Sequence, residues 1–264
     1  MHQIISPDNA QIKALAKLRR GGRRYDNALF LIDGLREIKE AALADWELEA
    51  IYFCPEISQE TADSLSKLGA EKFVSLSPQA FSRVCYKENP DGVLAVAYRQ
   101  DKTIKDIKLP KTLPLIVILE AIEKPGNLGA IIRTAKAASV DAVIVNDTKV
   151  DLYNPNVIRS SQGLIFGSQI IQAGREETID WLKEKKIRSL AAATSAAKEY
   201  WWGDLDSPIA LVLGSEAEGL SQEWLKAADE KLLIPMAKGV DSLNVSVSAG
   251  LLIYEANRQR AKIR

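Results

Sequence analysis

The sequence predicts two α/β domains in tandem, the second built on a parallel sheet. Short apolar runs alternate with helix-like segments along most of the 264 residues, and a polar, lysine-rich connection from Arg99 to Lys111 interrupts this alternation. We place the boundary near residue 105, which gives domains of residues 1–104 and 105–264. The hydrophobic content of 47% is normal for a chain with proper cores, so disorder is not expected.

The first hundred residues are predicted to form a small α/β domain, because helix-like and strand-like segments follow one another regularly. Helices are expected near residues 9–20, 35–44, 59–68 and after Pro78, and strands near residues 29–32, 49–53, 72–76 and 93–98.

The second series has apolar runs without polar alternation, which is typical of a parallel sheet covered by helices on both faces. Strands are expected near residues 115–119, 142–145, 169–172, 189–193, 209–213 and 231–234, and helices near residues 128–138, 155–161, 176–184, 222–228 and 244–260. Ligands of such sheets gather outside the carboxyl ends of the strands.

Several kinds of site are excluded by composition. The two cysteines, Cys54 and Cys85, cannot build a disulfide framework or a four-ligand zinc site, and we interpret them as buried free thiols. The sole histidine, His2, argues against a Ser-His-Asp triad and against histidine metal ligation, so no metal is expected. The apolar runs are too short to span a bilayer and no signal core is present, which favours a cytoplasmic protein.

Nucleotide-binding loops are also missing. Residues 120–129 contain no G-x-G-x-x-G, and the segment from Gly214 to Gly219 lacks the Lys and Ser/Thr that complete a Walker loop. A dinucleotide-dependent oxidoreductase or an NTPase therefore fits the α/β layout only.

Charge is uneven near the N-terminus, although lysine plus arginine and aspartate plus glutamate both total 35. The basic residues before residue 25 face a single acid, Asp8, and Gly21-Gly22 between arginine pairs would let an arm follow a phosphate backbone. We interpret these residues as an RNA-binding segment, with a solvated helix face as the alternative: Lys13, Lys17, Arg19, Arg20, Arg23 and Arg24.

Three polar or glycine-containing segments follow strands of the second series. In the first, Asn127 is placed to cap a helix and Arg133 to hold a phosphate or a charged intermediate, unless it is a surface arginine. The second runs from Gly214 to Leu220 and carries two carboxylates, one of which is a candidate partner for Arg133, unless both are exposed turn residues.

The third segment contains Ile234-Pro235-Met236, then Ser242 to Ser246, and leads into a helix that ends at Arg260. A strand end, a turn and a helix start converge there, as in a ligand pocket, and the plainer alternative is an N-cap by Ser242 or Asn244. Small residues of this helix up to Gly250 would permit close approach of another element, such as a second subunit.

Together, in this order and spacing, the three segments closely resemble the signature motifs of the SpoU (TrmH) family of RNA ribose 2'-O-methyltransferases, within the SPOUT superfamily. The resemblance spans residues 115–264. The N-terminal part, with Ser6 to Asn9, Lys13 and Phe30 to Gly34, is less specifically similar to the SpoU substrate-binding domain of ribosomal-protein type.

The resemblance implies a deep trefoil knot in the C-terminal domain, with S-adenosylmethionine (SAM) bound inside it. The residues that match the cofactor pocket are Thr194, Leu213, Gly214, Ile234, Met236 and Leu243. The residues that match the catalytic set are Arg133, which would activate the ribose hydroxyl as base or as alkoxide stabiliser, and Asn127, Glu216, Ser242 and Asn244, which would orient it.

The resemblance also implies a homodimer with its sites at the subunit interface, and a dedicated N-terminal domain favours rRNA over tRNA as substrate. A non-catalytic RNA-binding or ribosome-assembly protein that keeps the knotted fold is the rival hypothesis. Two segments stay open: Tyr200 to Trp202 either stacks on bases or belongs to a core or interface, and Asp151 to Asn156 is a candidate substrate loop.

Overall fold

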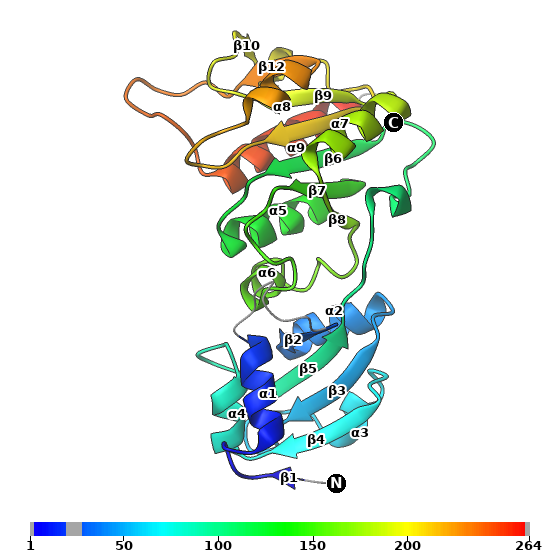
Figure 1. Ribbon diagram of the computed structural model, residues 1–264, viewed down its shortest axis with the longest axis vertical. Coiled ribbons are helices and arrows are strands. Elements are labelled where there is room, and N and C mark those ends of the chain that lie inside the picture. The colour runs from blue at the N-terminus through cyan, green and yellow to red at the C-terminus, as the bar shows by residue number, and fades with distance from the viewer. Residues whose placement is uncertain (1–2, 20–27, 262–264) are drawn as a thin grey trace. The chain divides into compact units, whose positions relative to one another are not determined.

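The computed structural model describes residues 3–19 and 28–261, and the chain divides into two compact units, each with its own sheet (Figure 1). The first unit contains Met1–Asp101 and Asp151–Gly167, and the second contains Lys102–Val150 and Ser168–Arg264. The division near residue 105 stays a prediction about independent domains. Residues 151–167 return to the first unit, so a single boundary in the sequence does not separate the two units.

The first unit has a mixed five-stranded sheet in the order β1-β4-β3-β5-β2, in which β1, β4 and β3 are parallel and β5 is antiparallel to both neighbours. Its elements are β1 (Gln3–Ile4), α1 (Ala10–Arg19), β2 (Leu29–Asp33), α2 (Leu35–Leu43), β3 (Leu48–Phe53), α3 (Ala62–Ser66), β4 (Lys72–Leu76), α4 (Pro78–Val84), β5 (Val93–Tyr98) and α6 (Pro155–Ser160). Helix α3 begins later than expected because Thr61 caps it by accepting a hydrogen bond from the backbone of Ser64. The two-residue β1 is not predicted by the pattern.

The returning segment is held in the first unit by an aromatic cluster and a partly buried ion pair. Phe30 stacks on Tyr153 with ring centroids 4.5 Å apart, and the Trp46 indole N–H donates to the Phe166 carbonyl at 3.0 Å. The guanidinium of Arg99 forms two hydrogen bonds to the Asp151 carboxylate, at 2.7 and 3.0 Å. Asp151 and Tyr153 therefore have structural partners within the first unit, and a role of residues 151–156 as a substrate loop stays a prediction.

The second unit has a seven-stranded sheet in the order β10-β12-β9-β11-β6-β7-β8, and all of its pairings are parallel, which confirms the predicted sheet. Its elements are a 3-10 helix (Ile104–Asp106), β6 (Leu115–Glu120), α5 (Pro125–Ala137), β7 (Ala142–Asn146), β8 (Ile170–Ala173), α7 (Arg175–Lys185), β9 (Arg188–Ala192), β10 (Lys198–Glu199), a 3-10 helix (Tyr200–Trp202), β11 (Ile209–Leu213), α8 (Gln222–Ala227), β12 (Glu230–Leu233) and α9 (Val245–Arg260).

Helices cover both faces of this sheet. On one face, Trp181 of α7 and Trp224 of α8 pack with Ile116 and Ile118 of β6. On the other face α5 and α9 pack against each other, and α9 contacts β11. The carboxyl ends of the strands are left to loops, and these loops build the site.

The two cysteines are free thiols and differ in burial. Cys54 is buried and Cys85 is half-buried, so only the first matches the predicted burial, and both are free. Burial raises the pKa of each thiol.

None of the helices in the described part of the chain combines the length and apolar character that a bilayer crossing needs.

Candidate functional site

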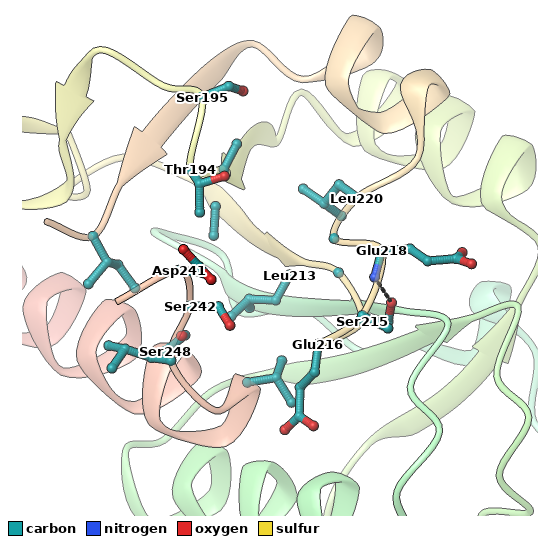
Figure 2. Close-up of a pocket in the computed structure, with 18 of the residues that line it drawn as sticks. Thr194, Ser195, Leu213, Ser215, Glu216, Glu218, Leu220, Asp241, Ser242 and Ser248 are labelled. Carbon is teal, nitrogen blue, oxygen red and sulfur yellow. Dashed lines mark hydrogen bonds between the residues drawn. The ribbon is translucent and has the colours of Figure 1, made fainter. Parts of the chain in front are cut away.

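A cavity of about 400 Å³ lies at the carboxyl edge of the second sheet (Figure 2). The segments that follow β9, β11 and β12 form its walls, together with the first turn of α9. This volume falls in the range of small-molecule sites, about 300 to 1,000 Å³. The position is the one expected for a ligand of a parallel sheet.

All six residues that the resemblance matches to the cofactor pocket line this one cavity. They are Thr194, Leu213, Gly214, Ile234, Met236 and Leu243. The lining also includes apolar side chains and hydroxyls that were not predicted, namely Leu220, Leu225, Leu232, Ser195 and Ser248. The structure thus brings the whole predicted set together, and its role in binding a cofactor stays a prediction.

Gly214 has to be a glycine because two stretches of backbone cross at that point. A Cβ built on Gly214 would lie 2.1 Å from the carbonyl carbon and oxygen of Gly219. The intervening turn is closed by hydrogen bonds in both directions between the Ser215 and Gly219 backbones, at 3.1 and 3.0 Å. This wall of the cavity is therefore a tight, preorganised loop.

A polar network joins the cavity wall to the starts of α5 and α9. The side-chain amide of Asn127 donates to Glu216 Oε1 at 2.6 Å, and that of Asn244 donates to the same oxygen at 2.7 Å. Asn244 also donates to Asn127 Oδ1 at 3.2 Å. The ammonium of Lys124 donates to the other carboxylate oxygen, Oε2. Three of the five predicted catalytic residues thus meet at one carboxylate.

The ion pair in this network favours the charged forms of both Glu216 and Lys124. The hydrogen bond from Lys124 is the largest cause that holds the pKa of Glu216 below its usual range, and Asn127 adds to it. The same hydrogen bond raises the pKa of Lys124. Glu216 is therefore a carboxylate and Lys124 an ammonium at neutral pH.

Within the chain, the predicted pairing of Arg133 with a carboxylate of the 214–220 loop does not form at Glu216, whose cationic partner is Lys124. Arg133 is exposed on α5, six residues after Asn127. Six residues correspond to roughly 9 Å along a helix and roughly 240° around it. Arg133 consequently projects from a different face of α5 than the network does.

The predicted helix caps are correct for only one of the two asparagines. Asn127 does not cap α5, because the helix begins at Pro125, a residue suited to the first helical position, and Lys124 is the N-cap. Asn244 does cap α9, since its Oδ1 accepts from the backbone N–H of Ser246 at 2.9 Å. Ser242 does not cap the helix and lines the cavity instead, as Figure 2 shows.

The residues predicted to bind RNA lie in the first unit, where they are described. Lys13 and Lys17 are exposed on α1, and Lys13 lies 3.6 Å from Asp8. The guanidinium of Arg19 donates to the Cys85 carbonyl at 3.0 Å, which ties the end of α1 to the chain after α4. The remaining three, Arg20, Arg23 and Arg24, lie outside the described residues.

The aromatic segment after β10 is at the surface rather than in the core. Trp202 is 71% exposed and Trp201 is 39% exposed. Tyr200 and Trp201 pack edge to face with centroids 5.0 Å apart. The assignment of this segment to a core is therefore wrong, and stacking or an interface stays open.

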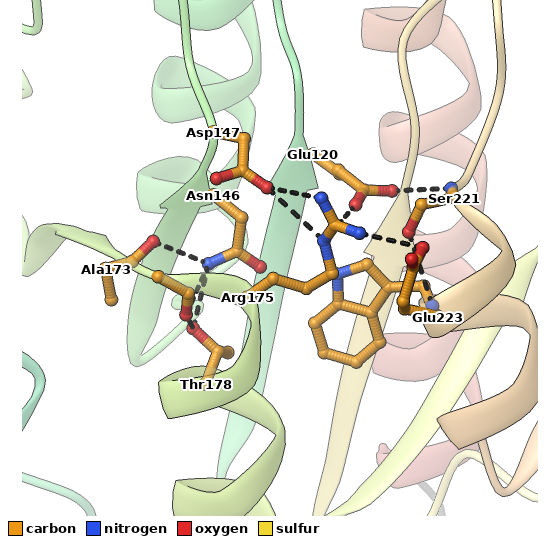
Figure 3. A network of polar contacts seen from close by, with 10 residues as sticks. Glu120, Asn146, Asp147, Ala173, Arg175, Thr178, Ser221 and Glu223 are labelled. Atoms are coloured by element: carbon orange, nitrogen blue, oxygen red, sulfur yellow. Dashed lines mark hydrogen bonds and ion pairs between the residues drawn. The ribbon is translucent and has the colours of Figure 1, made fainter.

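A second network, which the motifs do not predict, braces the same edge of the sheet (Figure 3). Arg175 of α7 lies 2.9 Å from buried Glu120 and 2.8 Å from Asp147 and from Glu223. Glu120 in turn accepts a hydrogen bond from the Ser221 backbone at 2.8 Å. Because Ser221 follows the 214–220 loop directly, this network fixes the exit of a cavity wall.

One signal in the sequence pointed to this brace. Glu120 ends an apolar run from Leu115, and a carboxylate in such a place is rarely buried without a partner. The sequence near Glu120 gives no signal that identifies Arg175 as its partner.

Over residues 3–19 and 28–261, no group of three His, Cys, Asp or Glu side chains is arranged to hold a metal ion.

A parallel sheet with a small-molecule cavity and a carboxylate network at its carboxyl edge defines an α/β ligand-binding domain of the kind found in enzymes. Comparison with known proteins gives the family. Residues 114–254 match the SpoU rRNA Methylase family, and residues 9–95 match the MRM3-like substrate binding domain. The chain belongs to the SpoU rRNA methylase family, which confirms the family that its motifs resemble.

Relatives and solved structures agree along nearly the whole chain. A 23S rRNA guanosine 2'-O-methyltransferase of Bacillus subtilis is 30% identical, over 96% of this chain and 98% of its own. A crystal structure of an RNA 2'-O ribose methyltransferase has a TM-score of 0.84 at 37% identity, and covers 98% of this chain and 99% of its own. AviRb from Streptomyces viridochromogenes, a SpoU methyltransferase solved with AdoMet, has a TM-score of 0.87 at 26% identity, covering 96% and 98%.

Proposed function

We propose that the protein transfers a methyl group from SAM to a ribose 2'-hydroxyl in RNA, with ribosomal RNA ahead of tRNA. One observation carries the proposal: the cavity lined by all six predicted cofactor residues shares Glu216 with the Asn127, Asn244 and Lys124 network. The relatives named as 23S rRNA 2'-O-methyltransferases, from Bacillus subtilis and Streptomyces viridochromogenes, support the substrate class.

The residues present fit SAM. Leucine side chains at positions 213, 225 and 232 offer an apolar surface for an adenine ring, and the hydroxyls of Thr194 and Ser242 offer polar contacts. The Gly214 crossing keeps side chains away from one wall and leaves backbone groups there. When bound, SAM supplies the methyl group that is transferred.

In this proposal the chain itself orients and polarises the nucleophile. Glu216 accepts a hydrogen bond from the 2'-hydroxyl, and the amides of Asn127 and Asn244 hold the carboxylate in position. Because the pKa of Glu216 is held low, the carboxylate suits orientation better than proton removal. Arg133 then either stabilises the developing alkoxide as a cation, while the hydroxyl proton passes to water, or takes the proton of the 2'-hydroxyl as a deprotonated guanidine. Ser242 contacts the ribose from the cavity side. Positioning and charge stabilisation account for most of the catalysis.

We further propose that Arg133 acts across a homodimer. Its face of α5 differs from that of Asn127, so within one chain it does not join the network. Helix α9 exposes Val247, Leu251 and Tyr254, by 50%, 37% and 53%, at the spacing of one helix face. These residues are better candidates for a subunit contact than the small residues of the same helix.

The small residues of α9 have a partner within the chain. Ala249 is fully buried, and a Cβ built on Gly250 would lie 3.9 Å from the Thr134 side chain of α5. At these two positions α9 therefore faces α5 of the same chain. A contact between subunits through the small residues of α9 stays a prediction.

We also propose that the second unit is knotted and that the protein is cytoplasmic. The deep trefoil knot would involve the chain from Ile234 to Asn244, which lines the cavity beside the 214–220 loop before α9 begins. A cytoplasmic location follows from ribosomal RNA as the proposed substrate.

The test is methyl transfer from radiolabelled SAM to ribosomal RNA isolated from a strain that lacks the gene. Periodate-resistant 2'-O-methyl nucleotides should appear with the wild-type protein. Arg133→Ala should lose turnover while calorimetry shows that SAM still binds. If the wild type binds RNA but neither binds SAM nor transfers methyl groups, the protein is instead a non-catalytic RNA-binding or ribosome-assembly factor.

A further inference from the structure

We propose that Lys124 binds the RNA phosphate that flanks the target ribose, while Glu216, which it contacts, receives the ribose hydroxyl. This inference rests on the proposed function and adds a residue to it. Lys124 is not one of the residues that the three motifs single out, and its place in the site follows from the structure alone.

The position of Lys124 leaves it free to take a ligand. It is the N-cap residue of α5, its side chain is 69% exposed, and its Nζ contacts Glu216 Oε2. An ammonium group has three N–H donors, so two remain for a second partner. The exposed side chain thus carries a cation and spare donors to the edge of the cavity wall.

Glu216 presents its second carboxylate oxygen on the same side. Its Oε1 accepts from both Asn127 and Asn244, whereas its Oε2 accepts from Lys124. The Val245 backbone N–H also interacts with this carboxylate and helps to lower its pKa. The ribose hydroxyl is placed at Oε2, where Lys124 is the side-chain donor, so an anionic acceptor and spare cationic donors lie side by side.

This pair matches a feature specific to RNA. In an RNA strand the 2'-hydroxyl, a hydrogen-bond donor, is on the carbon next to the one that carries the 3'-phosphate. An acceptor beside a cation is complementary to that arrangement, and the 2'-hydroxyl is the group that distinguishes RNA from DNA. Lys124 on the phosphate and Glu216 on the hydroxyl would place the 2'-oxygen next to the cavity.

Charge gives a second reason for a cation at this position. A lone Glu216 carboxylate would repel a polyanionic substrate, and Lys124 neutralises it. The N-terminus of the 13-residue helix α5 adds a partial positive charge at the same place. The pKa of Lys124 is raised by Glu216, so the residue acts as a cation and not as a base.

A nearby ion pair supplies a matched control. Lys149 contacts Glu123 at 2.6 Å, and its side chain is 72% exposed, close to the value for Lys124. Glu123, unlike Glu216, is not part of the cavity lining. Lys149→Met therefore removes the same charge from the same kind of surface pair, one that is hydrogen-bonded to Glu123 and not to Glu216 and that interacts with the cavity lining only electrostatically, through Glu218.

The experiment compares full-length wild type, Lys124→Met, Lys124→Arg and Lys149→Met on ribosomal RNA from a strain that lacks the gene. Initial rates of methyl transfer are measured against RNA concentration at several KCl concentrations, and SAM binding is measured by calorimetry. Lys124→Met should lower kcat/KM for RNA about 10- to 100-fold, as expected for one charged hydrogen bond. The slope of log kcat/KM against log salt should become shallower by about 0.7 to 0.9.

Lys124→Arg should keep most of the activity and the full slope, Lys149→Met should behave as wild type, and all variants should bind SAM. An unchanged salt slope in Lys124→Met overturns the phosphate contact even if turnover falls, and so does an equal loss of slope in Lys149→Met. Absence of methyl transfer by the wild type would instead overturn the proposed function.

Discussion

The Asn127 amide and the Glu216 carboxylate, 89 positions apart in the sequence, are joined by a hydrogen bond of 2.6 Å. Asn127 lies in the first turn of α5, which follows β6, and Glu216 lies in the loop after β11. The strands β6 and β11 are paired in the sheet, so their carboxyl ends deliver the two side chains to one place. The parallel topology therefore assembles the candidate site.

Glu216→Gln tests the carboxylate at the centre of this network. A glutamine can still accept from the amides of Asn127 and Asn244, but it presents an NH₂ group to Lys124 and has no charge. We expect kcat to fall about 10- to 100-fold, in line with the loss of a charged hydrogen bond. Radiometric methyl transfer measures the change, and calorimetry should show that SAM binding is kept.

Glu123→Gln is the matched control for that variant, because it removes a carboxylate paired with Lys149 on an exposed surface. It should leave turnover at the wild-type level. Full activity of Glu216→Gln would show that the carboxylate has no part in the reaction.

Gly214→Ala tests the backbone crossing that forms one wall of the cavity. The new Cβ would lie 2.1 Å from two backbone atoms of Gly219, so the loop has to move. We expect a loss of about 1 to 3 kcal/mol in the free energy of unfolding, as for other overpacked sites. The rise in melting temperature on adding SAM should disappear, because a ligand stabilises only the state that binds it.

Gly174→Ala serves as the comparison for this glycine. Its φ is −68° and a Cβ there meets nothing within 4 Å, so stability and the SAM-induced shift should stay close to wild type. A SAM-induced shift of normal size in Gly214→Ala would remove this loop from the cofactor site.

The sheet of the second unit was predictable because its central strands are apolar runs without polar alternation. Residues 115–119 of β6 and 209–213 of β11 are all apolar and buried, so no polar face marks a side open to solvent. The membership of residues 151–167 in the first unit was not predictable, because Tyr153 and Phe166 find Phe30 and Trp46 more than 100 positions away. Local pattern carries no information about such partners.

The candidate site was predictable in its members but not in its pairings. The motifs identify Asn127, Arg133 and Glu216, yet the cation beside Glu216 is Lys124. The difference follows from where α5 begins: with Pro125 at the first position, Asn127 lies inside the first turn and its side chain is free to reach Glu216. Because the sequence predicted that this helix starts at residue 128, Asn127 was expected to be its N-cap.

Phe166→Ala tests whether the returning segment is part of the first unit. Phe166 is 3% exposed, and its ring lies 5.1 Å from Trp46 and 6.0 Å from Phe30 between centroids. Removing a buried phenylalanine side chain costs about 3 to 5 kcal/mol. We expect hydrogen exchange to quicken in β2 and α2, although the substitution is more than 100 positions away.

Protection of β6 and the affinity for SAM should be unchanged in Phe166→Ala, since both belong to the second unit. Faster exchange in β6 with normal protection of β2 would assign the segment to the second unit instead.

The acid limb of the pH profile tests the pairing of Lys124 with Glu216. Lys124 is the main cause that lowers the pKa of Glu216 from its ordinary value of 4.5. A carboxyl group whose pKa is depressed on folding contributes stability above its unfolded pKa, and loses it as the pH falls through the folded value. In the wild type the contribution of this pair is therefore lost below pH 4.5, and Glu216 stays ionised down to that range.

In Lys124→Met the main cause of the low pKa is removed while Asn127 still donates to Glu216, so the pKa of Glu216 should rise toward its ordinary value. Protonation then removes the acceptor for the ribose hydroxyl at a higher pH. We expect the acid limb of kcat against pH to move upward in Lys124→Met, and to stay in place in Lys149→Met because Glu123 lies outside the cavity lining. Coincident acid limbs for the three proteins would mean that ionised Glu216 is not required for turnover.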